Sequence, residues 1–227
     1  RTTCPADAAG YAQICRYAER KAPGATVWAV EGTGSYGAGL TSELLARGQR
    51  VCEGDRPKRV GRRRGKSDDI DAERAARQVL AEPVPAAPRA RGDRDAMRLR
   101  LATREQIMRD RTRAVNALKA AVLTAPDSLR STLKNLSTVE LVDRCLRLRT
   151  TTGHDLETRH TIECLRAMAK RYRNFTAEIT EHDTALQELV EQACPQILDL
   201  FGVGPITAAE LLTGWSYPGR IHSRGAF

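Results

Sequence analysis

The sequence predicts an α/β domain followed by an all-helical region, and three observations carry this prediction. Short apolar runs alternate with helix-forming segments in the first part of the chain, which is typical of an α/β layer with a largely parallel sheet. Two later segments repeat apolar residues at heptad spacing, which is typical of long paired helices. Near the end, a Gly-x-Gly-Pro sequence joins two shorter apolar segments. We expect an α/β domain at 1–81, a linker at 82–92, a helical coiled-coil domain at 93–195, and the start of a further domain at 196–227.

In the first domain, Asp7 can cap a helix that runs to Arg20. The run at 26–30 is predicted to be a short buried strand that ends in Glu31, and a Gly-rich turn at 32–37 follows it. A helix containing Leu40, Leu44 and Leu45 precedes a second strand at 50–52. Glu31 then lies at the carboxyl end of a strand, where parallel sheets place their functional sites.

The segment 56–66 is strongly basic and contains no acidic residue. Its seven cations are Arg56, Lys58, Arg59, Arg62, Arg63, Arg64 and Lys66. The chain of 227 residues carries a formal net charge of +9, and without these seven the balance is only +2. A concentrated positive segment of this kind fits contact with nucleic acid, although a solvated loop is the alternative.

A helix-forming run follows the basic segment directly and opens with Asp68, Asp69 and Asp71. Asp68 and Asp71 are three residues apart, so both are expected on one helix face. Carboxylate oxygens are the ligands that Mg²⁺ prefers, and Glu31 could supply a third. The alternative is that these acids only cap the helix and oppose its dipole.

The Pro-rich segment at 82–88 is the clearest domain boundary, and the composition changes to long helices after it. The two heptad stripes consist of Met97, Leu101, Arg104, Met108, Arg111, Val115, Leu118 and Val122, and of Leu165, Met168, Tyr172, Phe175, Ile179, His182, Leu186, Leu189 and Ala193. Heptads alone do not identify the partner, so an intramolecular hairpin and a dimer interface are both open. Shorter helical pieces are expected at 127–158.

The segment 197–212 resembles a helix–hairpin–helix, with two helices joined at the glycines. The amide groups at the start of its second helix could hold a phosphate, which makes Gly202, Gly204 and Thr207 candidate nucleic-acid contacts. A plain tight turn between packed helices is the alternative.

Other features narrow the class of protein. No stretch approaches the roughly 20 apolar residues that span a bilayer, and we recognise no signal peptide. The six cysteines include no C-x-x-C pair, so we expect reduced thiols and a cytoplasmic location. The four histidines show no metal-ligand spacing, and the Gly-rich turn at 32–37 lacks the G-K-[ST] of a phosphate-binding loop.

Three stretches together resemble a known family: VWAVEGTGSYG, RPKRVGRRRGKSDDIDAERAA and LFGVGPITAAELL, in this order. They are similar to the DEDD-type transposases of bacterial insertion sequences, which are recombinases guided by a bridge RNA. The resemblance implies a RuvC-like (RNase H-like) first domain, a helical coiled-coil domain and a C-terminal transposase domain. It also implies Mg²⁺, DNA and a guide RNA as partners, and a homodimer or higher oligomer.

The resemblance assigns three of the family's four acids to Glu31, Asp68 and Asp71. The first aspartate would precede Arg1, and the family's nucleophilic serine in a P-x-x-S-G-like motif has no counterpart, because Ser216 and Ser223 do not match it. We therefore expect the chain to be an incomplete portion that binds nucleic acid without exchanging strands. Two alternatives are a RuvC-like junction nuclease that uses metal-activated water, and a non-catalytic remnant that binds nucleic acid and dimerises.

Overall fold

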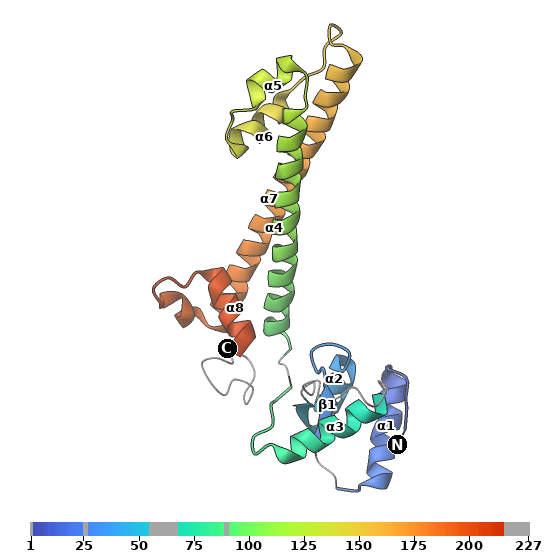
Figure 1. Ribbon diagram of the computed structural model, residues 1–227. Coiled ribbons are helices and arrows are strands. Elements are labelled where there is room, and N and C mark those ends of the chain that lie inside the picture. The colour runs from blue at the N-terminus through green and yellow to red at the C-terminus, as the bar shows by residue number, and fades with distance from the viewer. Residues whose placement is uncertain (1, 25–26, 55–67, 89–90, 216–227) are drawn as a thin grey trace. The chain divides into compact units, whose positions relative to one another are not determined.

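The computed structural model describes residues 2–24, 27–54, 68–88 and 91–215. The described chain is mostly helical and contains a two-stranded parallel sheet (Figure 1). It divides into two compact units, one centred on the sheet within residues 1–92 and one spanning Asp93–Thr213. They are called the sheet unit and the helical unit below.

The sheet unit has the order α1 (Ala8–Lys21), β1 (Val27–Glu31), α2 (Ala38–Ala46), β2 (Arg50–Gly54) and α3 (Asp68–Ala81). Strands β1 and β2 are parallel, with Val27 opposite Arg50 and Glu31 opposite Gly54. Helix α2 connects them, because parallel strands need a crossover connection. The carboxyl ends of both strands therefore lie at the same edge of the sheet.

The two faces of this sheet are covered by different helices. Val30 and Val51 are buried on one face with Cys15 of α1 and Leu44 of α2. Helix α3 contacts both strands, and it lies on the other face. A Cβ placed on Gly54 would lie 2.6 Å from the Cβ of Ala75 in α3, so glycine is needed for this approach.

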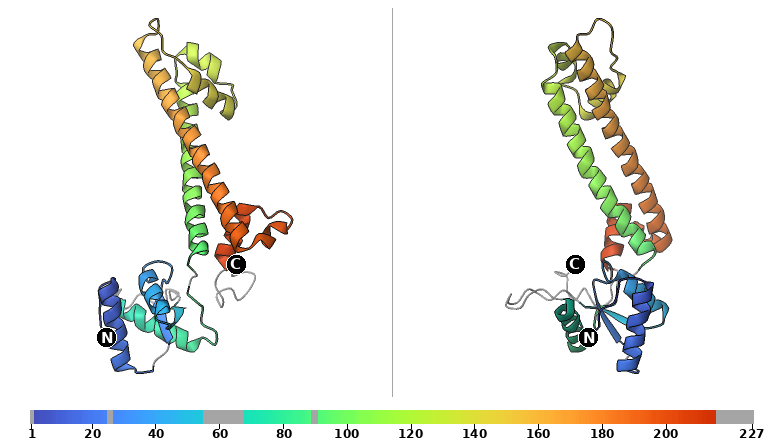
Figure 2. Two further views of the ribbon diagram at one scale, coloured as in Figure 1. Left: turned by 180° about the vertical axis from the view of Figure 1, so that it is seen from behind. Right: turned by 90° about the vertical axis from the view of Figure 1, so that its right-hand side faces the viewer.

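The helical unit is built on two long helices, α4 (Asp93–Leu123) and α7 (Leu156–Ala193), which run antiparallel along each other (Figure 2). The shorter helices α5 (Asp127–Leu133) and α6 (Thr138–Arg147) pack at one end. The 3-10 helix η1 (Pro195–Asp199) and helix α8 (Pro205–Trp215) pack at the other.

Each end of the helical unit has its own apolar core. At the α5–α6 end, Leu118 of α4 and Leu165 of α7 are fully buried with Leu133 and Cys145. Burial raises the pKa of the Cys145 thiol to about 11, so this cysteine is a neutral packing residue at neutral pH. The second core lies at the α8 end and consists of Met97, Leu186, Val190, Ala208 and Ala209.

Between these cores the contact between α4 and α7 is more polar. The Arg104 side chain donates to the carboxylate of Asp183, and the Arg111 guanidinium lies 5.9 Å from the centre of the Tyr172 ring. Arg104, Met108 and Arg111 belong to the heptad stripe predicted on α4, and its two arginines make this middle part of the stripe charged. The heptad stripes match the contact only in part, because Met108 and Ala193 are exposed, whereas Ala169 and Val190 lie outside the stripes and are buried. The two ends supply most of the apolar burial.

Several element predictions are confirmed. Asp7 caps α1 by accepting a hydrogen bond from the Gly10 amide at 2.8 Å, and α3 begins at Asp68. The strands lie where the apolar runs predict them. Of the two partners that the heptads left open for α7, the structure shows the intramolecular one, α4, and a dimer interface stays a prediction. One prediction differs, because the first helix of the expected helix–hairpin–helix is the single 3-10 turn η1. Pro195 ends α7 and begins a 3-10 helix of only five residues. The domain bounds at 1–81, 82–92, 93–195 and 196–227, and a coiled-coil geometry, stay predictions.

Candidate active site

Glu31 is the last residue of β1 and lies at the carboxyl edge of the sheet. Successive strand residues point to opposite faces, so Glu31 projects away from the face that Val30 shares with α1 and α2. It projects toward the face that α3 covers. Its register partner Gly54 lies close against Ala75 of α3. Glu31 is partly exposed.

The turn after Glu31 folds back onto the strand. Gly32 has a φ of 65°, a backbone conformation that favours glycine, and its carbonyl accepts hydrogen bonds from the amides of Ser35 and Gly37. A Cβ on Gly37 would lie 2.6 Å from the Glu31 carbonyl oxygen. The glycines are therefore needed for the backbone to approach β1 itself. The prediction that this turn approaches nucleic acid stays a prediction. The Tyr36 ring at the tip is almost fully exposed.

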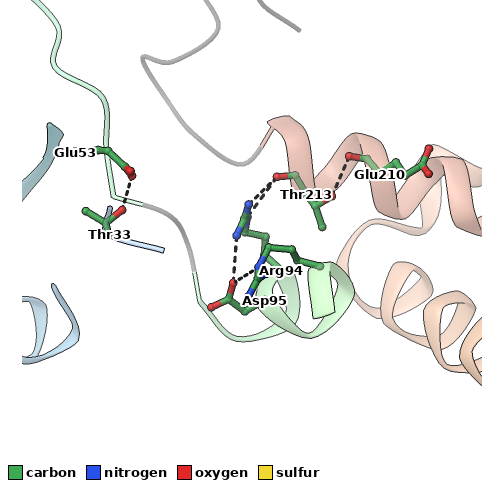
Figure 3. Close-up of polar contacts among 7 residues, drawn as sticks. Thr33, Glu53, Arg94, Asp95, Glu210 and Thr213 are labelled. Atoms are coloured by element: carbon green, nitrogen blue, oxygen red, sulfur yellow. Dashed lines mark hydrogen bonds and ion pairs between the residues drawn. The ribbon is translucent and has the colours of Figure 1, made fainter. Parts of the chain in front are cut away.

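A second carboxylate, that of Glu53, lies at this edge, and it is not among the residues that the sequence led us to expect there. Glu53 of β2 lies opposite Val30, is buried, and accepts a hydrogen bond from the Thr33 hydroxyl in the turn (Figure 3). Its amide donates to the Ala86 carbonyl at 2.8 Å. Glu53 lies on the opposite sheet face from Glu31, so its structural role is to tie the turn to β2. Glu53, like Glu31, lies at the carboxyl end of a strand, and this position is the sequence signal that could have identified it.

Asp68 and Asp71 lie in the first turn of α3. The side chains of residues 68–71 are outside the described part of the structure, and so is the whole segment 55–67. The predicted convergence of Glu31, Asp68 and Asp71 therefore stays a prediction. The same holds for the seven cations of the segment 56–66.

The second predicted nucleic-acid contact lies in the turn before α8. Gly202 has a φ of 81°, and the Gly204 carbonyl accepts from the Ala208 amide at 2.9 Å in the first turn of the helix. Gly202, Gly204 and Thr207 are all exposed, and the Phe201 ring beside them is fully exposed. Their role in binding a phosphate stays a prediction.

Helix α8 is fastened at its other end to the start of α4. Arg94 donates to the Thr213 carbonyl from Nε at 3.3 Å and from Nη2 at 3.1 Å, and it contacts Asp95 at 3.2 Å (Figure 3). A cation at a helix carboxyl end satisfies carbonyls that have no partner within the helix and opposes the dipole. This contact joins the carboxyl end of α8, the helix that follows the turn at Gly202–Gly204, to the start of α4.

Among the described side chains, no three His, Cys, Asp or Glu residues lie together as a metal-binding group. Asp68 and Asp71 do not enter that search, because their side chains are not described. In the described part of the chain, no helix is both long and apolar enough to span a membrane.

The comparisons with known proteins identify the family. The family model of the IS110-type DEDD transposases, described as a transposase, matches residues 1–125. Neither the curated proteins nor the solved structures gave a match. The match covers more than half of the 227 residues, and the chain therefore belongs to the IS110-type DEDD transposases. At the level of the family, these are DNA-cleaving and DNA-recombining enzymes of insertion sequences.

Proposed function

We propose that this chain supplies metal-binding acids, Glu31, Asp68 and Asp71, to a DNA transposase that cleaves and exchanges strands with Mg²⁺. The observation that carries the proposal is the placement of Glu31 on the sheet face that α3 covers. Ala75 is buried against that face, and Asp71 and Asp68 precede it by four and seven residues. Helical periodicity puts these positions on the same side of α3 as Ala75.

The donor set fits the metal. Three carboxylates supply hard oxygen ligands and negative charge, and Mg²⁺ keeps several of its own waters, so a small acid set is enough. When bound, the cation would offset the negative charge that develops on the scissile phosphate. The contribution of the chain is to hold Glu31 on a short strand whose following turn is fixed by Thr33 and Glu53.

The substrate-holding surfaces are proposed to be the basic segment 56–66 and the turn Gly202–Thr207. The first adjoins α3, and its seven cations suit a phosphate backbone. The second presents amides at the start of α8, which is fastened by Arg94. We include a guide RNA among the partners because the family resemblance of the motifs implies it.

The active form is proposed to be a homodimer or higher oligomer. Helix α4 occupies one side of α7, but Phe175 stays half-buried near the middle of the pair, and Leu99 and Met108 of α4 are exposed. Sedimentation velocity across a range of concentrations tests this proposal. Phe175→Asp is expected to lower the associated fraction, and a wild-type chain that sediments as a monomer at every concentration would contradict it.

Metal binding tests the acid set directly. We would titrate the chain with Mn²⁺, as a spectroscopic substitute for Mg²⁺, and follow free Mn²⁺ by electron paramagnetic resonance. Glu31→Gln, Asp68→Asn and Asp71→Asn are each expected to weaken binding by tenfold or more, on the order of 1.4 kcal/mol. Asp69→Asn is the matched control, since its position lies on another side of the same helical turn. Equal losses in all four variants would contradict the assignment.

The basic segment is tested separately by salt dependence. Neutralising Arg62, Arg63 and Arg64 together to glutamine is expected to reduce the slope of log affinity against log salt for a DNA duplex by about 2 to 3, because each phosphate contact contributes about 0.9. An unchanged slope would mean that the segment is only solvated.

A further inference from the structure

The helical unit separates its charges between its two ends. Residues 111–173, which include α5 and α6, contain thirteen Lys and Arg against six Asp and Glu, a balance of +7. Residues 93–110 together with 174–213 contain five against eleven, a balance of −6. The two balances nearly cancel over the whole unit, so its net charge does not reveal the separation. These two regions are called the basic end and the acidic end.

The antiparallel pairing of α4 and α7 makes this a separation in space. Arg111 lies over the ring of Tyr172, which sets residues 111–123 beside the first half of α7. Arg104 bonds Asp183, which sets the first half of α4 beside the second half of α7 (Figure 2). The two basic stretches therefore share one end of the unit.

The charge of α7 changes sign at Asn174. The Lys and Arg residues of this helix all precede that position: Arg159, Arg166, Lys170, Arg171 and Arg173. From Asn174 to Ala193 its charged residues are all acidic. A helix dipole favours anions near the N-terminus and cations near the C-terminus, so the stability of α7 itself does not account for this order. At the basic end α4 is also positive, and the two helices repel each other there.

Part of this charge is free to contact a partner. Arg166, Lys170 and Arg173 follow one another at steps of four and three, which puts them on one side of α7. All three are exposed, and none forms an ion pair with a described carboxylate. By contrast, Arg113 of α4 is paired with Asp110 at 3.1 Å. The three cations lie about 6 and 4.5 Å apart along the helix, within reach of successive phosphates of a nucleic-acid strand.

We propose that the basic end of the helical unit is a second nucleic-acid-binding surface, centred on Arg166, Lys170 and Arg173, that contacts the phosphate backbone of a double-stranded segment. The acidic end would repel the same backbone and thereby restrict how the duplex lies along the unit. Most of this surface lies after residue 125, beyond the part matched by the transposase family model. The proposal depends neither on the metal site nor on the segment 56–66.

The test uses the whole chain and two labelled probes, a 20-base-pair DNA duplex and an RNA duplex of the same length. Fluorescence anisotropy at several salt concentrations gives the log–log slope for each. The variant Arg166→Gln/Lys170→Gln/Arg173→Gln is expected to reduce the slope by about 2 to 3 for at least one probe. A reduction for one probe only would identify that nucleic acid as the partner.

A matched control removes the same net charge from the acidic end. Arg98→Gln/Arg100→Gln/Arg109→Gln alters three exposed cations of α4, and it is expected to leave the slope unchanged. Circular dichroism checks that both variants keep their helices. Combining the basic-end variant with neutral Arg62, Arg63 and Arg64 should give additive reductions, because each lost phosphate contact removes its own contribution to the slope.

Three results would overturn the proposal. Equal slope reductions in both triple variants would mean that only net charge matters. No reduction in either would mean that the basic end does not contact nucleic acid. A basic-end variant that loses self-association in sedimentation while its slope is unchanged would show that the surface binds a second copy of the chain.

Discussion

The sheet unit and the helical unit differ in the kind of sequence feature that indicates their function. In the sheet unit, short motifs with unusual residues at strand ends identify the protein, and the family match begins there. The helical unit carries one such motif, at residues 200–212, and its other notable feature is the distribution of ordinary charged residues over two long helices. The difference shows that a motif can be read locally, whereas a charge separation becomes visible only when the pairing of the helices is known.

The two units also differ in how much apolar burial supports them. The helical unit has two separate cores with fully buried Leu118, Leu165 and Leu186. The sheet unit buries a smaller cluster around Leu44 and relies on close backbone approaches at Gly37 and Gly54. We expect changes of core volume to dominate in the helical unit and changes at glycine to dominate in the sheet unit.

The largest expected effect is in the core of the helical unit. Leu165→Ala removes a fully buried side chain between α4, α6 and α7, and it is expected to lower the free energy of unfolding by about 2–5 kcal/mol. Leu156→Ala on the same helix is the control, because Leu156 is exposed and its loss should change the value by less than about 0.5 kcal/mol. Urea denaturation measures both, and similar losses would contradict the assigned core.

The next effect concerns the contact between β2 and α3. Gly54→Ala places a methyl group 2.6 Å from the Cβ of Ala75 and is expected to cost about 1–3 kcal/mol. Gly153→Ala is the control, since its Cβ would meet no described heavy atom within 4 Å. Amide hydrogen exchange should show the loss of protection within the sheet unit, and Ala75→Gly should restore part of it. Loss confined to the helical unit would be inconsistent with the described packing.

The smallest effect is a pH dependence at the start of α7. Asp155 accepts a hydrogen bond from the Thr158 amide at 2.7 Å, and hydrogen bonds with Thr158 lower the pKa of this carboxyl below 3.8. Its contribution is therefore present above pH 3.8 and is lost as the pH falls through the lower folded-state pKa. Asp155→Asn keeps a capping side chain but does not titrate.

The measurement compares urea midpoints of the wild type and Asp155→Asn from pH 6 to pH 2. Any advantage of the wild type should shrink below pH 3.8, whereas Asp155→Ala should be less stable than Asp155→Asn at every pH. An advantage that grew on acidification would show that the carboxylate is not stabilised by the cap.

The sequence predicted most elements of both units because local signals carry them. Asp7 and the acids at the start of α3 mark helix ends, and the apolar runs before Glu31 and Gly54 mark strands. The heptads indicated two paired helices but not their partner, because the spacing is the same for a hairpin and a dimer. The short apolar run before Gly202 looked like a helix, but after Pro195 it forms only a 3-10 turn.

The candidate site was predictable only in part. Glu31 follows from the position of a strand end, whereas the pairing of Glu53 with Thr33 requires the register of β1 against β2. The opposite orientation of Glu31 and Glu53 also depends on that register. The sequence alone therefore identified one acid of the sheet edge and missed the one that holds the turn.

Glu31 and the two aspartates Asp68 and Asp71 of α3 are proposed to form one metal site. A crystal structure of the chain with Mn²⁺, located by anomalous scattering, tests this claim most directly. We expect a single site with carboxylate oxygens of Glu31, Asp68 and Asp71 in its coordination sphere, at roughly the 2.1 Å typical of small divalent cations. A Glu31 side chain directed to the opposite face of the sheet, or an ion bound only at Asp69, would contradict this metal site.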